Sequence, residues 1–112
     1  MGDERLIETG LLRIRSVRSG DEHHICLFGE LDFGSMNAVD EEVARVEATN
    51  ATRIVLDLGG LDFADSSAIG LLVRLYERSR RDAGRLVLLR APERVDHVFR
   101  LTGVDKHLPF IN

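Results

Sequence analysis

Cysteine, tryptophan, proline and long apolar runs are all scarce in this chain of 112 residues. The one cysteine, Cys26, excludes an intrachain disulfide, so nothing in the sequence requires an oxidising compartment. The longest apolar stretch, at 68–73, stops at Arg74 and is far shorter than the roughly 20 apolar residues of a membrane-spanning helix. No apolar segment follows a basic start, as it would in a signal peptide. We therefore expect a cytoplasmic protein without a membrane span.

Aromatic residues and positive charge are also in short supply. Aromatics make up 5% of the chain and the formal net charge is −4, whereas a nucleic-acid binder needs a basic face and rings on which bases stack. Four arginines do cluster near the end of an expected helix, where cations complement the helix dipole; they are Arg74, Arg78, Arg80 and Arg81. No direct binding of nucleic acid is expected.

No cluster of side chains has the spacing of metal ligands. His23 and His24 are adjacent in an expected strand, so their side chains must point to opposite faces and cannot share a metal ion. We expect neither a metal nor a cofactor.

What is present is the pattern of an α/β fold. A chain of this length can bury its own core and is expected to form a single domain over residues 1–112. Alternation of apolar and polar residues predicts a first strand, and a second follows it after a turn and pairs with it as a hairpin. Continuous apolar runs predict two more strands. The expected strands are 11–17, 24–28, 53–58 and 85–89, with a short last strand at 108–111.

Three helices lie between and after these strands. Apolar residues recur at helical spacing from the expected N-cap Ser35, from the end of the 58–71 stretch, and from Pro92. In the second helix the expected buried stripe is Ile69, Leu72, Val73 and Tyr76, widened by Leu71 and Leu75. The order β-β-α-β-α-β-α-β predicts a mixed sheet with helices packed on it. Because 53–58 and 85–89 have no polar face, both are expected to be central strands.

The stretch 58–71 is the most informative part of the chain. It contains a glycine pair, Gly59 and Gly60, which predicts a loop, and then Asp65, Ser66 and Ser67 at the start of a helix. Asp65 or Ser66 suits the N-cap, which is worth about 1 kcal/mol, but capping does not account for all three residues. Unpaired N–H groups and the positive end of the dipole favour anions at such a helix end. The pattern therefore indicates a functional site that displays serine hydroxyls.

Glycine within the first turn of that helix also needs a reason. Gly70 costs roughly 1 kcal/mol relative to alanine inside a helix. We interpret it as a position where another group approaches closely.

Three motifs occur in a familiar order along the chain. They are Gly29-Glu30-Leu31-Asp32 after the second strand, the run from Leu56-Asp57-Leu58 into Asp65-Ser66-Ser67 with Gly70, and Asp82-Ala83-Gly84-Arg85 before an apolar strand. Together, over residues 11–111, they resemble the STAS domain and more narrowly the bacterial anti-sigma factor antagonists. The resemblance implies a single STAS-like domain. Members usually have glycine where this chain has Ala68, and many continue into another helix.

The resemblance also implies a function. In that family the unphosphorylated antagonist binds an anti-sigma factor, which is a serine kinase, and thereby releases a sigma factor. The kinase phosphorylates the serine directly after the aspartate of the motif, which is Ser66 here, and a separate phosphatase removes the phosphate. Ser67 is a second, less favoured acceptor. The partner-binding residues that the resemblance implies are Asp32, Asp65, Ser66, Ser67, Ala68 and Gly70, with Asp32 near Ser66. The catalytic machinery belongs to the kinase, so the chain is expected not to be an enzyme.

Two other functions are compatible with these residues. The first is an enzyme with Ser66 as nucleophile and His97 or His107 as base, but Ala64 to Ala68 lacks the Gly-x-Ser-x-Gly of a nucleophile elbow. The second is a STAS interaction module that works without phosphorylation, as a scaffold in a stress-signalling complex or as an accessory subunit of a transporter.

Overall fold

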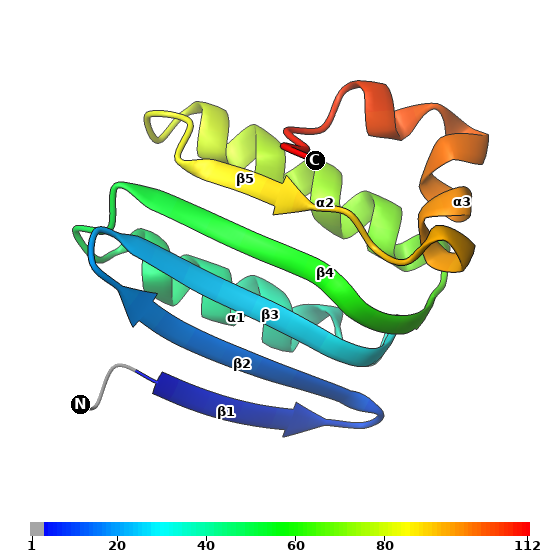
Figure 1. The fold of residues 1–112 in the computed structure, drawn as a ribbon, viewed down its shortest axis with the longest axis horizontal. Coiled ribbons are helices and arrows are strands. Elements are labelled where there is room, and N and C mark those ends of the chain that lie inside the picture. Colours follow the sequence, from blue (N-terminus) through cyan, green and yellow to red (C-terminus); the bar gives the residue numbers. More distant parts are fainter. Residues whose placement is uncertain (1–3) are drawn as a thin grey trace.

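A five-stranded sheet with two helices behind it forms the body of the molecule in the computed structural model, which describes residues 4–112 (Figure 1). The strands are β1 (Glu4–Thr9), β2 (Leu12–Ser19), β3 (Glu22–Leu31), β4 (Arg53–Ala64) and β5 (Leu86–Leu89). The helices are α1 (Met36–Glu47), α2 (Ser66–Arg80) and α3 (Glu93–Thr102), followed by a 3-10 turn, η1 (Val104–Lys106). The expected mixed α/β fold is confirmed.

The strands follow one another in the sheet in the order of the chain. The pairs β1–β2 and β2–β3 are antiparallel, whereas β3–β4 and β4–β5 are parallel and are connected through α1 and α2. The predicted opening hairpin and the predicted parallel pairs are therefore confirmed. Both crossover helices lie on one side, and the face turned toward the reader in Figure 1 carries no helix in the described part of the chain. The molecule is thus a two-layer structure.

Two elements at the ends of the chain differ from the prediction. Strand β1 was not predicted, because most of its residues are exposed and carry no buried stripe that a sequence pattern could reveal. The strand predicted at 108–111 is reduced to one parallel bridge between Leu88 and Phe110.

The prediction that both apolar strands are central is wrong for β5, which lies at the edge of the sheet. The C-terminal segment covers its free edge instead. The Leu88 N–H donates to the carbonyl of Pro109 (2.9 Å), and the Ile111 N–H donates to the carbonyl of Leu88 (3.1 Å). An apolar strand is therefore tolerated at the edge because its outer side is covered.

The loop predicted at the glycine pair is also wrong, because β4 continues through it to Ala64. Gly60 pairs with Phe28 at a point where the register between β3 and β4 shifts. A Cβ on Gly60 would lie 2.3 Å from Cδ1 of Phe28 and 2.7 Å from the carbonyl oxygen of Leu27. Glycine is required here by the close approach of β3, in the manner of a β-bulge, and not by a turn.

The core lies between the sheet and the two crossover helices. The sheet-facing stripe of α2 is Ala68, Leu71, Leu72, Leu75 and Ser79, whereas Ile69, Val73 and Tyr76 are only partly buried. The predicted stripe is thus rotated around the helix. Both sides of α2 are apolar in sequence, so only packing against the sheet decides which side is covered.

Candidate functional site

The start of α2 presents its two serines unequally. Asp65 is the N-cap, and its Oδ1 accepts the backbone N–H of Ser67 at 2.8 Å. Ser66 is the first residue of the helix and is exposed, whereas Ser67 is partly buried. Of the two candidate N-caps the structure therefore selects Asp65, which leaves the side chain of Ser66 free at the mouth of the helix.

The carboxylate of Asp65 also connects this helix to the loop after β3. Its Oδ2 accepts the backbone N–H of Phe33 at 3.3 Å, and the backbone N–H of Asp65 donates to the carbonyl of Leu31 at 3.2 Å. Because β3 and β4 are parallel neighbours, their C-terminal ends meet at one edge of the sheet. The structure thus brings the first motif next to Asp65 and Ser66.

Asp32 holds the same loop in shape, just before α1 begins at Met36. Its Oδ1 accepts the backbone N–H and the hydroxyl of Ser35, both at 3.1 Å, and its own N–H donates to the Ser35 hydroxyl oxygen at 3.0 Å. Ser35 occupies the predicted N-cap position, but its hydroxyl makes no capping bond to α1. Asp32 is half-buried and lies in the loop that Asp65 holds.

Ala68 and Gly70 face different environments. The side chain of Ala68 is buried in the core, away from the surface on which Ser66 lies. Gly70 is exposed, and a Cβ placed on it would have only Nη1 of Arg74 within 4 Å, at 3.5 Å. Residues 4–112 therefore offer no close neighbour that requires glycine at position 70.

Large exposed apolar side chains lie on or next to the segments that carry this site, and the sequence reasoning missed them. Phe33 is 76% exposed and Phe63 is 48% exposed. Leu11 is also exposed, and its carbonyl accepts the N–H of Glu30 at 3.0 Å, next to the first motif. We call Leu11, Phe33 and Phe63 the apolar rim. The available signal was the aromatic residue directly after Asp32 and after Asp62, since exposed clusters of this kind mark interaction sites.

A separate cluster of polar groups lies inside the molecule, between β2, β3 and α1. The Ser16 hydroxyl is 2.7 Å from Nε2 of His23, and Glu42 is paired with Arg5 at 3.2 Å and with Arg45 at 2.6 Å. Ser16, His23 and Glu42 are 0%, 4% and 2% exposed. We call these three residues the buried cluster. Because all three side chains are almost fully buried, we assign the buried cluster a structural role.

The pKa values in the buried cluster reflect this burial. Burial lowers the pKa of His23, and the charge of Arg45 lowers it further. Burial raises the pKa of Glu42, but hydrogen bonds from Arg45 and Ser16 outweigh that effect and leave the pKa below its usual value. A neutral imidazole beside an ionised carboxylate is therefore favoured near neutral pH.

His23 and His24 lie on opposite sides of β3, as predicted from their adjacency. Within residues 4–112, no three side chains of His, Cys, Asp or Glu come close enough together to hold a metal ion. Nor does any helix in this range have the length and apolar character needed to cross a membrane.

These features define a two-layer α/β domain with a serine at the exposed start of α2, and residues 17–112 match the family model described as STAS domain. The anti-sigma F factor antagonist of Lysinibacillus sphaericus is 36% identical over an alignment of 84 residues that covers 71% of this chain and 69% of the relative. An anti-sigma factor antagonist from Mycobacterium paratuberculosis has a similar structure, with a TM-score of 0.77 at 22% identity over 88% of this chain and 84% of that one. The anti-sigma factor antagonist SpoIIAA in its unphosphorylated form matches with a TM-score of 0.61 at 26% identity, over 97% and 88% of the two chains. The chain therefore belongs to the STAS domain family and, within it, to the anti-sigma factor antagonists.

Proposed function

We propose that the unphosphorylated chain binds an anti-sigma factor that is a serine kinase, and that phosphorylation of Ser66 abolishes this binding. The observation that carries the proposal is the exposed position of Ser66 at the start of α2, beside Asp65 and the loop that Asp65 holds. Names of the curated relatives supply the class of partner, an anti-sigma factor. When the chain binds the anti-sigma factor, the sigma factor that the anti-sigma factor holds is released.

Electrostatics explain why a phosphate would act at the interface and leave the fold intact. It adds about −1.5 to −2 charges at neutral pH. Repulsion from Asp65 across about 6 Å of water is of the order of 1–1.5 kcal/mol, and the helix N-terminus offsets roughly 0.3–1 kcal/mol of it. Burying that charge against an unmatched partner costs on the order of 2–5 kcal/mol, which weakens binding by roughly 30- to 4000-fold.

The apolar rim and Gly70 support a docking surface around Ser66. Exposed Phe33 and Phe63 flank the helix start and are the kind of side chain that anchors protein interfaces. Among the described residues Gly70 has no neighbour that requires glycine, so we assign the close approach to the bound partner. In this proposal Asp32 and Asp65 hold the loop and the helix start that form the surface. Ala68 is buried and affects the surface only through the packing of α2 on the sheet.

In this proposal the chain is the substrate of the kinase and of a separate phosphatase, and it is not itself an enzyme. It would act in the cytoplasm, where sigma factors and ATP are found. Ser66 is favoured over Ser67 as acceptor because Ser66 is exposed and the N–H of Ser67 is held by Asp65.

The test begins with Ser66→Ala as bait in a lysate of the source cells, followed by identification of what binds. The purified partner, given Mg-ATP, should phosphorylate the wild-type chain once, at Ser66, and release it while retaining Ser66→Ala. Ser67→Ala is the control for the acceptor: the partner should still phosphorylate it once, at Ser66, and then release it. A phosphate on Ser67 alone, or a partner that holds the phosphorylated and unphosphorylated chains equally, would refute the proposal and favour a phosphorylation-independent module.

A further inference from the structure

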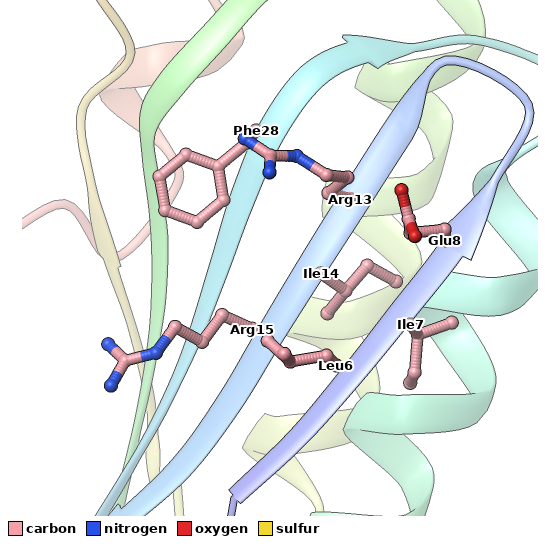
Figure 2. Close-up of a pocket in the computed structure, with 7 residues that line it drawn as sticks. All are labelled: Leu6, Ile7, Glu8, Arg13, Ile14, Arg15 and Phe28. Atoms are coloured by element: carbon pink, nitrogen blue, oxygen red, sulfur yellow. The ribbon is translucent and has the colours of Figure 1, made fainter.

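No helix of residues 4–112 covers the face of the sheet opposite α1 and α2, and this open face carries a regular arrangement of side chains. Registers between the strands place these side chains in three rows that cross the sheet. The first row is Glu4, Val17, His24, Val55 and Val87; the second is Leu6, Arg15, Cys26, Asp57 and Leu89; the third is Glu8, Arg13, Phe28 and Gly60. Figure 2 shows Leu6, Arg13, Arg15 and Phe28 projecting from three neighbouring strands at a hollow in this face.

The second row is nearly symmetric about β3 in the types of residue that it contains. A leucine lies at each end, Leu6 and Leu89, and the central residue is Cys26 on β3. Arg15 on β2 and Asp57 on β4 lie on either side of Cys26 and in register with it. If this row is laid over a copy of itself in reversed order, leucine meets leucine and each arginine meets an aspartate.

We propose that two copies of this chain pack face to face through this open face, about a two-fold axis parallel to β3. That axis reverses the strand order and keeps each row at its own level. It places Arg15 of each copy over Asp57 of the other, and Leu6 over Leu89. Cys26 lies next to its counterpart on the axis.

Charge selects this axis over the other possible one. A two-fold axis across the strands would place β2 over β2 and bring Arg13 close to Arg15 of the other copy, and such like-charge contacts oppose association. Arg15 is 48% exposed in the free chain, where it pairs with Glu4 at 2.8 Å. Its guanidinium has further donors available for a second carboxylate.

The size of the face sets the expected strength. Five strands about 4.8 Å apart and three rows about 6.7 Å apart cover roughly 24 Å by 20 Å, so about 1,000 Å² is buried in total. This is the lower limit for a specific interface, and we expect a dissociation constant on the order of 10–100 μM. Ser66 begins α2, in the layer behind the sheet, so the dimer leaves the proposed kinase site free and its test is independent of that function.

Sedimentation equilibrium of the full chain from micromolar to millimolar concentration tests the dimer. Wild type should change from monomer to dimer over this range. Arg15→Asp and Asp57→Arg should each weaken association by about tenfold or more, because like charges then meet twice, and the double variant Arg15→Asp/Asp57→Arg should restore it. Arg81→Asp, which makes the same charge change at the exposed end of α2, should leave it unchanged.

A thiol crosslink tests the axis itself. With packed sheets about 10 Å apart, a short bis-maleimide should join two copies through Cys26, and Arg15→Asp should lose most of that product. Because burial raises the pKa of the Cys26 thiol, the reaction is run at about pH 8 with denatured chain as a reactivity reference. Circular dichroism confirms that each variant is folded. A monomer at all concentrations, an equal dimer in Arg15→Asp and Arg81→Asp, or no crosslink would each overturn the proposal.

Discussion

The carboxylate of Asp65 accepts the backbone N–H of Phe33, a residue 32 positions earlier in the chain, while its other oxygen caps α2 through Ser67. One side chain thus fixes both the start of the helix that carries Ser66 and the loop after β3. The cap is local in sequence, but the bond to Phe33 exists only because β3 and β4 are parallel neighbours.

Asp65→Ala should therefore affect two segments at once. We expect a loss of about 1 kcal/mol in the free energy of unfolding from the missing cap, together with faster amide exchange at Phe33. Asp62→Ala removes an exposed aspartate from the same stretch and is the matched control. Denaturant unfolding and hydrogen exchange measure both effects. Unchanged exchange at Phe33 in Asp65→Ala would show that the bond does not hold the loop.

Ser66→Asp should separate binding from folding. The added charge lies at an exposed helix start beside Asp65, so repulsion and helix dipole nearly offset each other. We expect a melting temperature within a few degrees of wild type and binding to the anti-sigma factor weakened by about 30-fold or more. Ser66→Asn, close in shape but uncharged, should keep most of the affinity. Calorimetric melting and titration with the captured partner decide the outcome, and unfolding of Ser66→Asp would contradict it.

Gly60→Ala should destabilise the protein much more than Gly59→Ala. The new methyl at position 60 would meet the Phe28 ring and the backbone oxygen of Leu27, whereas at position 59 it meets the side-chain carboxylate of Asp57 at 2.9 Å. Backbone cannot move aside as a side chain can, so we expect a loss of about 1–3 kcal/mol for Gly60→Ala. Gly59→Ala should lose less than about 1 kcal/mol. Equal losses in urea unfolding would mean that β3 does not approach Gly60 closely.

Gly70→Ala should have opposite effects on stability and on binding. In the free chain the added methyl enters open space next to Arg74, and alanine is better than glycine in a helix by about 1 kcal/mol. The unfolding free energy should rise by up to that amount, while affinity for the anti-sigma factor falls. Ala44→Gly, at an exposed position inside α1, is the reverse control and should lower stability without changing affinity. Unchanged affinity in Gly70→Ala would remove Gly70 from the interface.

The buried cluster should make stability depend on pH. Burial and the Arg45 charge lower the pKa of His23, Arg18 and His24 lower it further, and Glu42 opposes them. His23 therefore binds a proton more readily in the unfolded chain than in the folded chain. Its contribution to the free energy of unfolding is complete above the ordinary histidine pKa of 6.5 and is lost as the pH drops below that value. The slope is at most about 1.4 kcal/mol per pH unit.

His23→Gln, whose amide can still bond to Ser16, should remove this slope just below pH 6.5. His97→Gln, at an exposed position on α3, should retain it. The contribution of Glu42, whose pKa lies below its ordinary 4.5, is lost only at more acidic pH, so the two effects separate in a series of urea titrations. An identical slope in His23→Gln and His97→Gln would assign the effect to another group.

Sequence patterns predicted the parts of this protein that depend on neighbouring residues. Alternation predicted the faces of β2, helical spacing predicted α1 to α3, and the residue types at 65–67 predicted a capped helix start. Of the two serines expected to be displayed there, only Ser66 is exposed. Strand β1 was missed because an exposed edge strand has no buried stripe. Strand β5 was misplaced because the segment predicted as a strand at 108–111 forms only one bridge with it and does not extend the sheet.

The sequence alone determined the three helices, strands β2 to β5 and the residues that stand at the start of α2, because turn, cap and periodicity preferences act over a few residues. Only the tertiary structure decided that the Asp65 carboxylate accepts the N–H of Phe33 and that Phe28 packs directly against Gly60. It also decided that no helix of the described residues covers one face of the sheet. These relationships depend on the register between strands that lie far apart in the chain. Register is set by the packing of the whole core, which no local pattern contains.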